Sequence, residues 1–317
     1  MTKRSPRDAR DQFQAMMDAQ KLPVVAAPMF IVSGPKLVRA ECEAGVIGSF
    51  PALNARPAEA LSEWIDEIKG AGRPFAVNHI VHRSNDRLMH DLEVTVRHQV
   101  PIAITSLGAR PEVFEATQSY GGLCFHDVIN NTFARKAVEK GADGLILVAA
   151  GAGGHAGTLS PFAFVAEVRE WFDGPILLSG AIATGRGVLA ARAAGADAAY
   201  IGSAFIATDE ANAPDPYKNG VTAGGMEDIV YTNYFSGVHG NYLKPSIAAA
   251  GMDPDNLPEG DPSKMDFKSG GESSAKVWKD IWGAGQGIGS VKSVDPVAAL
   301  VDRLAGEYAE ARRALKG

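Results

Sequence analysis

The sequence predicts an α/β fold, a (β/α)8 TIM barrel with a loop- and helix-rich C-terminal extension. Three observations support this prediction: short apolar runs recur about every 25 residues, segments of helical period separate them, and the runs are apolar on both faces. Strands that are apolar on both faces and joined by helices form parallel sheets. Eight units of near-equal length favour a closed barrel over an open sheet.

The elements follow one another in a regular order. Strands are predicted at residues 22–27, 46–50, 74–78, 101–105, 121–126, 144–148, 175–179 and 198–202. Helices are predicted between them at 57–69, 87–98, 111–119, 132–140, 162–172 and 187–194. Gly141 and Gly195 each end a helix and precede Ala-Asp and the next strand, which indicates an internal repeat. No Gly-x-Gly-x-x-Gly follows the first strand, so a dinucleotide-binding fold is not indicated.

From residue 209 onward the pattern changes. Residues 231–247 are rich in Tyr, Asn and Gly, and residues 251–271 in Pro, Asp, Ser and Gly, which predicts long loops with a few helices. Asp295 as N-cap and Pro296 as first residue predict a last amphipathic helix to about Leu315. The expected organisation is a barrel core over 1–208, substrate-side loops and helices over 209–290, and a C-terminal helix packing on the barrel over 291–317.

Composition excludes several classes of protein. The 317 residues carry 31 Lys+Arg against 37 Asp+Glu, and 46% are hydrophobic, which predicts a large core and argues against nucleic-acid or membrane partners. Cys42 and Cys124 are too few for a disulfide framework and are predicted to be small buried side chains. The N-terminus has no apolar leader, and the uncharged stretch 144–166 contains five glycines, so a soluble cytoplasmic protein is predicted.

Residues after the C-terminal strand ends form the active site in such a barrel. No Lys stands there, which argues against a Schiff-base aldolase. No convergent ligand set is evident, so no metal site is predicted, although a few potential ligands are present: His79, His82, His126 and Asp127. The loops after the seventh and eighth strands are Gly-rich and are predicted to bind a phosphate through backbone N–H groups at Gly180, Ala181, Gly202 and Ser203.

His155 is the most prominent single residue. It follows Gly153 and Gly154 in a loop directly after the sixth strand, where no apolar side chain is available to bury an imidazole. We therefore predict that its ring points into the barrel mouth and is functional. His90 and His98 lie on a charged predicted helix and are expected to face solvent, whereas no role is assigned to His82 or His239.

Several motifs together resemble the nitronate monooxygenase family, formerly called 2-nitropropane dioxygenases. The resemblance extends from about Leu22 to Gly289, and its most specific part is the Gly-Gly-His-x-Gly element at 153–157. The other matching motifs are Ala27-Pro28-Met29, Val77-Asn78, Gly141-Ala142-Asp143-Gly144, Ser179-Gly180, Gly202-Ser203 and the segment 282–287. Two positions depart from many or some relatives: Gly151 replaces an acidic residue, and Asp127 replaces a lysine.

The resemblance implies an FMN-dependent oxidoreductase that uses oxygen to convert alkyl nitronates to a carbonyl compound and nitrite. It implies that His155 acts as base or positions the anionic substrate. It also implies cofactor contacts at Ala27, Pro28, Met29, Asn78, Asp127, Gly153, Gly154, Ser179, Gly180, Ala181, Gly202, Ser203, Gly285 and Gln286. A redox cofactor that supplies the difficult chemistry agrees with the few ionisable groups at the strand ends.

Two alternatives remain open from the sequence. The same fold and Gly-Gly-His element occur in FMN-dependent NAD(P)H:quinone reductases and enoyl-ACP reductases. A flavin-free phosphate-binding isomerase or lyase could use the same loops with His155 as a base. The expected partners are a small-molecule substrate and oxygen, and the oligomeric state stays open.

Overall fold

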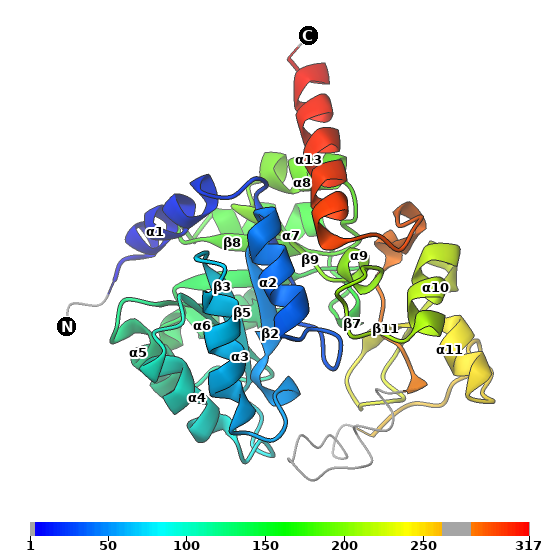
Figure 1. The fold of residues 1–317 in the computed structure, drawn as a ribbon, viewed down its shortest axis with the longest axis horizontal. Helices are drawn as coiled ribbons and strands as arrows, with labels where there is room; N and C mark the ends of the chain where they lie inside the picture. Colours follow the sequence, from blue (N-terminus) through cyan, green and yellow to red (C-terminus); the bar gives the residue numbers. More distant parts are fainter. Residues whose placement is uncertain (1–3, 262–279, 317) are drawn as a thin grey trace.

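The computed structural model describes residues 4–261 and 280–316. Its main sheet has eight parallel strands in the order β1-β9-β8-β6-β5-β4-β3-β2. A parallel bridge between Val25 and Ile47 joins the first and last strands of that order, so the barrel is nearly closed (Figure 1). The strands are β1 (Val24–Ala26), β2 (Gly48–Pro51), β3 (Phe75–Ile80), β4 (Ile102–Ser106), β5 (Leu123–Val128), β6 (Gly144–Val148), β8 (Ile176–Ser179) and β9 (Ala198–Ile201). The predicted (β/α)8 barrel is confirmed.

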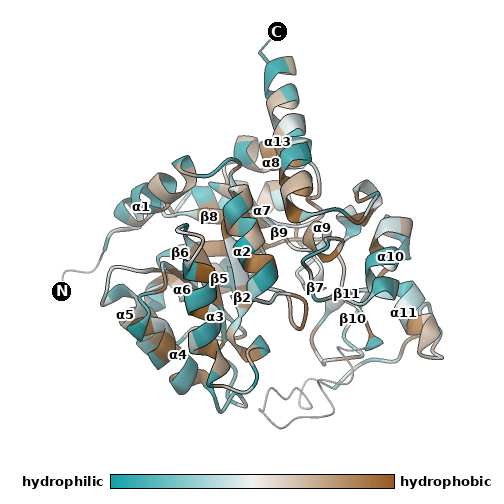
Figure 2. Ribbon diagram, in the orientation of Figure 1, coloured by the Kyte–Doolittle hydropathy of each residue, from teal (hydrophilic) through white to brown (hydrophobic). Residues whose placement is uncertain are grey.

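Helices cover the outside of the barrel, and each of them combines hydrophilic and hydrophobic residues (Figure 2). They are α2 (Pro35–Ala44), α3 (Ala60–Lys69), α4 (Leu88–Arg97), α5 (Pro111–Gln118), α6 (Asn131–Lys140), α7 (Pro161–Arg169) and α8 (Gly185–Ala194). Gly141 and Gly195 end α6 and α8 in the left-handed conformation, as predicted. Cys42 and Cys124 are buried and free, also as predicted.

An N-terminal helix, α1 (Pro6–Asp18), closes the end of the barrel at which the strands begin. Its residues Ala9, Phe13 and Met17 join the interior cluster of the barrel, and the Phe13 ring meets Phe125 of β5 edge-on at 5.1 Å. The sequence alone does not predict this helix, because the N-terminal residues are charged throughout. Contact with the strands supplies the missing stabilisation.

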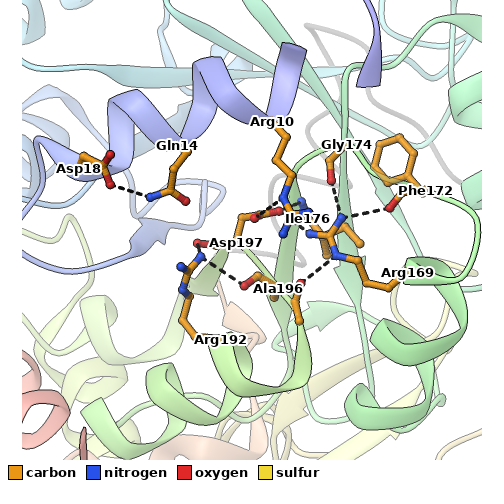
Figure 3. Close-up of polar contacts among 11 residues, drawn as sticks. Arg10, Gln14, Asp18, Arg169, Phe172, Gly174, Ile176, Arg192, Ala196 and Asp197 are labelled. Atoms are coloured by element: carbon orange, nitrogen blue, oxygen red, sulfur yellow. Dashed lines mark hydrogen bonds and ion pairs between the residues drawn. The ribbon is translucent and has the colours of Figure 1, made fainter. Parts of the chain in front are cut away.

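The aspartates of the two Gly-Ala-Asp repeats have the same structural role. Asp143 accepts a hydrogen bond from Cys124 N, and Asp197 accepts one from Ile176 N, each at 2.8 Å in the neighbouring strand. Arg10 Nε lies 2.8 Å from Asp197 Oδ1, and Arg169 pairs with the other carboxylate oxygen (Figure 3). These aspartates therefore tie adjacent strands together at the end of the barrel that α1 covers.

The C-terminal extension contains a small sheet that the sequence analysis interpreted as loops. Strands β10 (Ile229–Thr232) and β11 (Gly240–Leu243) form an antiparallel pair, and β11 also pairs with β7 (Gly154–His155) in the loop after β6. The short helices α9 (Ser203–Ile206), α10 (Asp215–Ala223) and α11 (Lys244–Ala249) accompany it. The extension lies to one side of the barrel in Figure 1.

The last helix, α13 (Val297–Ala314), packs against α2 and α8. The predicted cap was wrong by one residue: Pro296 is the N-cap, and the Asp295 carboxylate accepts a hydrogen bond from Ser293 instead. Packing on α8 is close, because a Cβ on Gly185 would lie 2.1 Å from Leu304 O. Over the described residues, no helix is long and apolar enough to cross a membrane. The three-part division of the chain remains a prediction.

Candidate active site

A cavity of about 1220 Å³ opens at the C-terminal ends of the barrel strands. It exceeds the roughly 300–1,000 Å³ typical of a site for one drug-sized ligand. Its wall includes most of the predicted site residues, namely Ala27, Pro28, Met29, Asn78, Asp127, Gly153, Gly154, His155, Ser179, Gly202 and Ser203. The structure thus brings residues from six different strand ends to one chamber.

Four predicted residues do not line the cavity: Gly180, Ala181, Gly285 and Gln286. They pack behind its wall, where Gln286 N donates to Gly151 O at 2.9 Å and Ala181 N donates to the same oxygen at 3.3 Å. A Cβ on Gly285 would lie 2.5 Å from Gly151 O. The segment around Gly285 therefore supports the loop that carries His155.

Gly202 and Ser203, at the end of β9, form an open backbone turn on the cavity wall. The atoms nearest to a Cβ on Gly202 would be Ala27 Cβ at 3.4 Å and Met29 Sδ at 3.6 Å, which are ordinary contact distances. Within the described part of the chain, the backbone N–H groups of Gly202 and Ser203 have no hydrogen-bond acceptor. Ser203 Oγ accepts a hydrogen bond from Gly285 N at 2.8 Å and retains its own proton to donate. Such a turn can bind an anionic oxygen.

Polar side chains on β3, β4 and β5 form a row across the cavity floor. Asn78 Nδ2 donates to Ser106 Oγ at 2.8 Å, and Ser106 hydrogen-bonds Asp127. Burial raises the pKa of Asp127 to about 6, although the Ser106 hydrogen bond opposes this shift. Burial, and secondly the Asp127 charge, also raise the pKa of Tyr200, which lines the same cavity. The row presents both donors and acceptors to a flat polar ligand.

His155 is held by the extension rather than by the barrel. It pairs with Gly240 in β11, and Asn241 Nδ2 donates to Ala152 O at 2.6 Å across the same junction. Its Nε2 lies 2.8 Å from Ser236 Oγ, which also contacts Val238 O at 3.0 Å. His155 lines the cavity and is only half-buried overall, yet burial of the ring lowers its pKa to about 4. The imidazole is therefore neutral near pH 7.

The remaining histidines do not converge on a ligand set. His79 and His126 are buried against Thr95 and Thr105 Oγ1, and burial lowers the pKa of each to about 4. His82 hydrogen-bonds Ser84, and His239 stacks on Tyr231. His90 is 46% exposed as predicted, but His98 is only 12% exposed because Ser62 and Asp66 bind its ring. Among residues 4–261 and 280–316, no group of three or more His, Cys, Asp or Glu could hold a metal ion.

Sequence reasoning missed three cavity or support residues: Tyr200, Tyr217 and Ser236. Tyr200 stands at an inward-facing strand position, so strict alternation along β9 could have identified it. Tyr217 stacks on Trp282, with ring centroids 5.1 Å apart. No sequence signal connects Ser236 with His155, because the two are 81 residues apart.

The residues present fit a flavin mononucleotide. The open turn at Gly202 and Ser203 offers unpaired N–H groups to a phosphate, and Asn78, Ser106 and Asp127 offer hydrogen bonds to a planar ring. The cavity wall near Ala27, Pro28 and Met29 is apolar and suits an aromatic face. Fold and cavity together are typical of a barrel enzyme, and enzymes of this fold carry their active sites at the C-terminal strand ends.

Comparison with known proteins identifies the family. The nitronate monooxygenase family model matches residues 13–307, so the chain belongs to the nitronate monooxygenase family. Enzymes of this family are flavin-dependent oxidoreductases. The resemblance stated from the motifs is confirmed.

Individual relatives are distant and differ in activity. A (3aS,4S,5R,7aS)-5-hydroxy-7a-methyl-1-oxo-octahydro-1H-indene-4-carboxyl-CoA dehydrogenase from Rhodococcus jostii is 27% identical over 71% of this chain, which spans only 63% of that relative. A nitronate monooxygenase from Paraburkholderia phytofirmans is 25% identical over 93% of this chain and 94% of its own. The solved nitroalkane oxidase from Streptomyces ansochromogenes is similar with a TM-score of 0.83 and 29% identity, covering 95% of this chain and 99% of its own.

Proposed function

We propose that the protein oxidises alkyl nitronates, and nitroalkanes after loss of a proton, with FMN and molecular oxygen. Two nitronates and one oxygen molecule would give two carbonyl compounds and two nitrite ions, which balances atoms and charge. Each carbon–nitrogen bond breaks, and each carbon gains one oxygen atom. When bound, FMN would supply the redox chemistry by taking electrons from the substrate and passing them to oxygen.

The observation that carries this proposal is His155 at the cavity wall. Burial keeps its imidazole neutral near pH 7, because its pKa is lowered to about 4. A neutral imidazole can accept the proton that a nitroalkane carbon loses, whereas an imidazolium cannot. The sequence left open whether His155 acts as base or pairs with an anion. Its neutral state near pH 7 leaves the imidazole able to accept a proton.

The chain's own residues would hold the cofactor at two places. Gly202 and Ser203 would bind the phosphate through backbone N–H groups and the Ser203 hydroxyl. Pro28, Met29 and Asn78 would contact the ring, with Asp127 hydrogen-bonded beyond Asn78 through Ser106. Because Asp127 has a raised pKa near 6, it can change protonation near neutral pH beside the ring.

A reductase is the second candidate function. The similarity to a carboxyl-CoA dehydrogenase favours it, since the same cavity could accept a thioester with His155 as the proton-transfer group. The NAD(P)H:quinone reductase and enoyl-ACP reductase alternatives belong to the same group. The flavin-free isomerase or lyase is set aside, because the family consists of oxidoreductases.

One assay separates these functions. Purified protein is denatured and the supernatant chromatographed to identify the flavin, and nitrite release is then measured from preformed propyl nitronate under oxygen without nicotinamide. We expect FMN and nitrite. Flavin reduction that requires NADH or NADPH, with no reaction of the nitronate, would replace the proposal by the reductase. Recovery of FAD, or a colourless protein that takes up no FMN, would refute the cofactor assignment.

A further inference from the structure

The cavity extends beyond the barrel mouth along one face of α6. This extension, which we call the basic arm, is formed by Leu107, Ile129, Phe133, Lys136, Ala137 and Lys140. The four α6 residues are spaced three and four apart, so they form one stripe of the helix. The arm lies at β4 and β5, whereas the Gly202 turn follows β9, which is three strands from β5 and four from β4 in the barrel order.

The basic arm combines an apolar wall with unbalanced positive charge. Lys136 has neither a hydrogen-bond nor an ion-pair partner among the described residues, and Lys140 donates to the Ala109 carbonyl at 2.8 Å. Asp127 and Asp280 are the acidic members of the cavity lining, and neither belongs to α6 or the adjoining loops of the arm. The Lys140 charge also contributes, after burial, to the lowered pKa of His126 at the barrel wall.

Backbone geometry gives a second observation at the same place. Leu107 has a φ of 59°, in the left-handed region that non-glycine residues seldom adopt. The next residue, Gly108, has a φ of 149°, and a Cβ there would lie 3.0 Å from Val81 O. Such strained residues cluster where a loop is shaped for a ligand.

We propose that the basic arm binds the anionic end of an elongated, otherwise apolar substrate whose reacting end faces His155. The apolar wall would cover the chain of the substrate, and the ammonium groups of Lys136 and Lys140 would pair with its terminal carboxylate or phosphate. The inference rests on the proposed function for the identity of the site, since it concerns the substrate of the same cavity. It is tested by binding rather than turnover, so it can fail or succeed independently of nitronate oxidation.

The test compares octanoate with octanol, which share a chain and differ in charge. Calorimetric titration of the flavin-loaded protein should show that octanoate binds more tightly than octanol. Lys136→Gln should lower the affinity for octanoate about fivefold and leave the affinity for octanol unchanged. Raised salt should weaken octanoate alone. Octanoyl-CoA distinguishes the two possible anionic groups. If Lys136→Gln lowers the affinity for octanoyl-CoA more than the affinity for octanoate, the arm binds a phosphate. If it lowers the affinity for octanoyl-CoA less, the arm binds a carboxylate.

Two matched variants make the test decisive. Lys69→Gln removes the same charge from an exposed position on α3 outside the cavity and should change nothing. Arg56→Gln removes a cation that lines the same cavity but does not belong to the basic arm. The proposal is overturned if octanoate binds no tighter than octanol, if Lys136→Gln weakens both equally, or if Arg56→Gln weakens octanoate and Lys136→Gln does not. Thermal melting confirms that each variant is folded.

Discussion

The two ends of the barrel differ in whether a buried aspartate has an ion-pair partner. At the N-terminal ends of the strands, Asp197 is 3% exposed and is surrounded by Arg10, Arg169 and the Ile176 N–H (Figure 3). At the C-terminal ends of the strands, Asp127 has hydroxyl and amide neighbours but no ion-pair partner among the described residues. Burial raises the pKa of Asp127 to about 6. The aspartate at one end is therefore held in ion pairs, whereas the aspartate at the other end can interact with a ligand.

The difference shows where this chain uses its polar groups for stability and where for chemistry. A carboxylate that is fully paired holds strands together and does not readily change its protonation. A buried carboxylate or imidazole without a charged partner can exchange protons with a ligand, but it makes folding less favourable. The same division between a stabilising and a reacting face is general in barrels of this type.

The largest expected effect is at His155 on the reacting face. Replacing it with alanine should lower kcat/KM for a neutral nitroalkane about 10²- to 10⁴-fold, because general base catalysis is lost. The loss on preformed nitronate should be much smaller, since that substrate has already lost its proton. Steady-state kinetics on both forms, with flavin content measured for each preparation, check this.

The wild-type pH profile tests the same residue. Because the pKa of His155 is lowered to about 4, the base should stay neutral as pH falls from 7 and become protonated only near that value. Activity on the neutral nitroalkane should therefore fall near pH 4 as His155 is protonated, and an ionisation near pH 6 that preformed nitronate shows as well belongs to Asp127. Equal losses of His155→Ala on both substrates would show that His155 positions the substrate rather than abstracting a proton.

The stabilising face gives the second prediction. Asp197→Ala should lower the free energy of unfolding by about 3 kcal/mol, because it leaves Arg169 Nη2 and the Ile176 N–H without their acceptor. Asp302→Ala is the matched control: Asp302 is 66% exposed in its pair with Lys21, so the loss should be under about 1 kcal/mol. Urea denaturation measures both. If both variants lower the free energy of unfolding equally, burial of the Asp197 ion pairs does not increase their contribution to stability.

The strands and most of the cavity-lining residues could be predicted from the sequence, whereas α1 and the support of His155 could not. Strands such as 144–148 are local apolar runs, so their existence and order follow from the pattern alone. The docking of Phe13 in α1 and the contact between Ser236 and His155 depend on residues far apart in the chain. The β10–β11 hairpin was missed because its Tyr, Asn and Gly residues are typical of loops, and pairing with β7 stabilises it.

The third prediction concerns the Gly202 turn. Gly202→Asp should weaken FMN binding about 10- to 100-fold, because a carboxylate would lie beside the phosphate. Gly202→Ala should change binding little, since its Cβ would make only ordinary contacts with Ala27 and Met29. Fluorescence titration of the apoprotein with FMN distinguishes the two. Similar affinity of both variants would place the phosphate elsewhere.

The smallest expected effect is at Ser236, which acts on the reaction only through His155. Ser236→Ala removes a hydrogen bond of 2.8 Å to Nε2, so kcat/KM for the neutral nitroalkane should fall about 3- to 10-fold while that for nitronate stays near wild type. Ser236→Thr, which keeps the hydroxyl, should restore most of the activity. Ser84→Ala is the matched control, because it removes a Ser–His bond of the same 2.8 Å length at His82, which does not line the cavity. If Ser84→Ala lowers activity as much as Ser236→Ala, the Ser236 effect is one of general stability, and the extension does not orient the base.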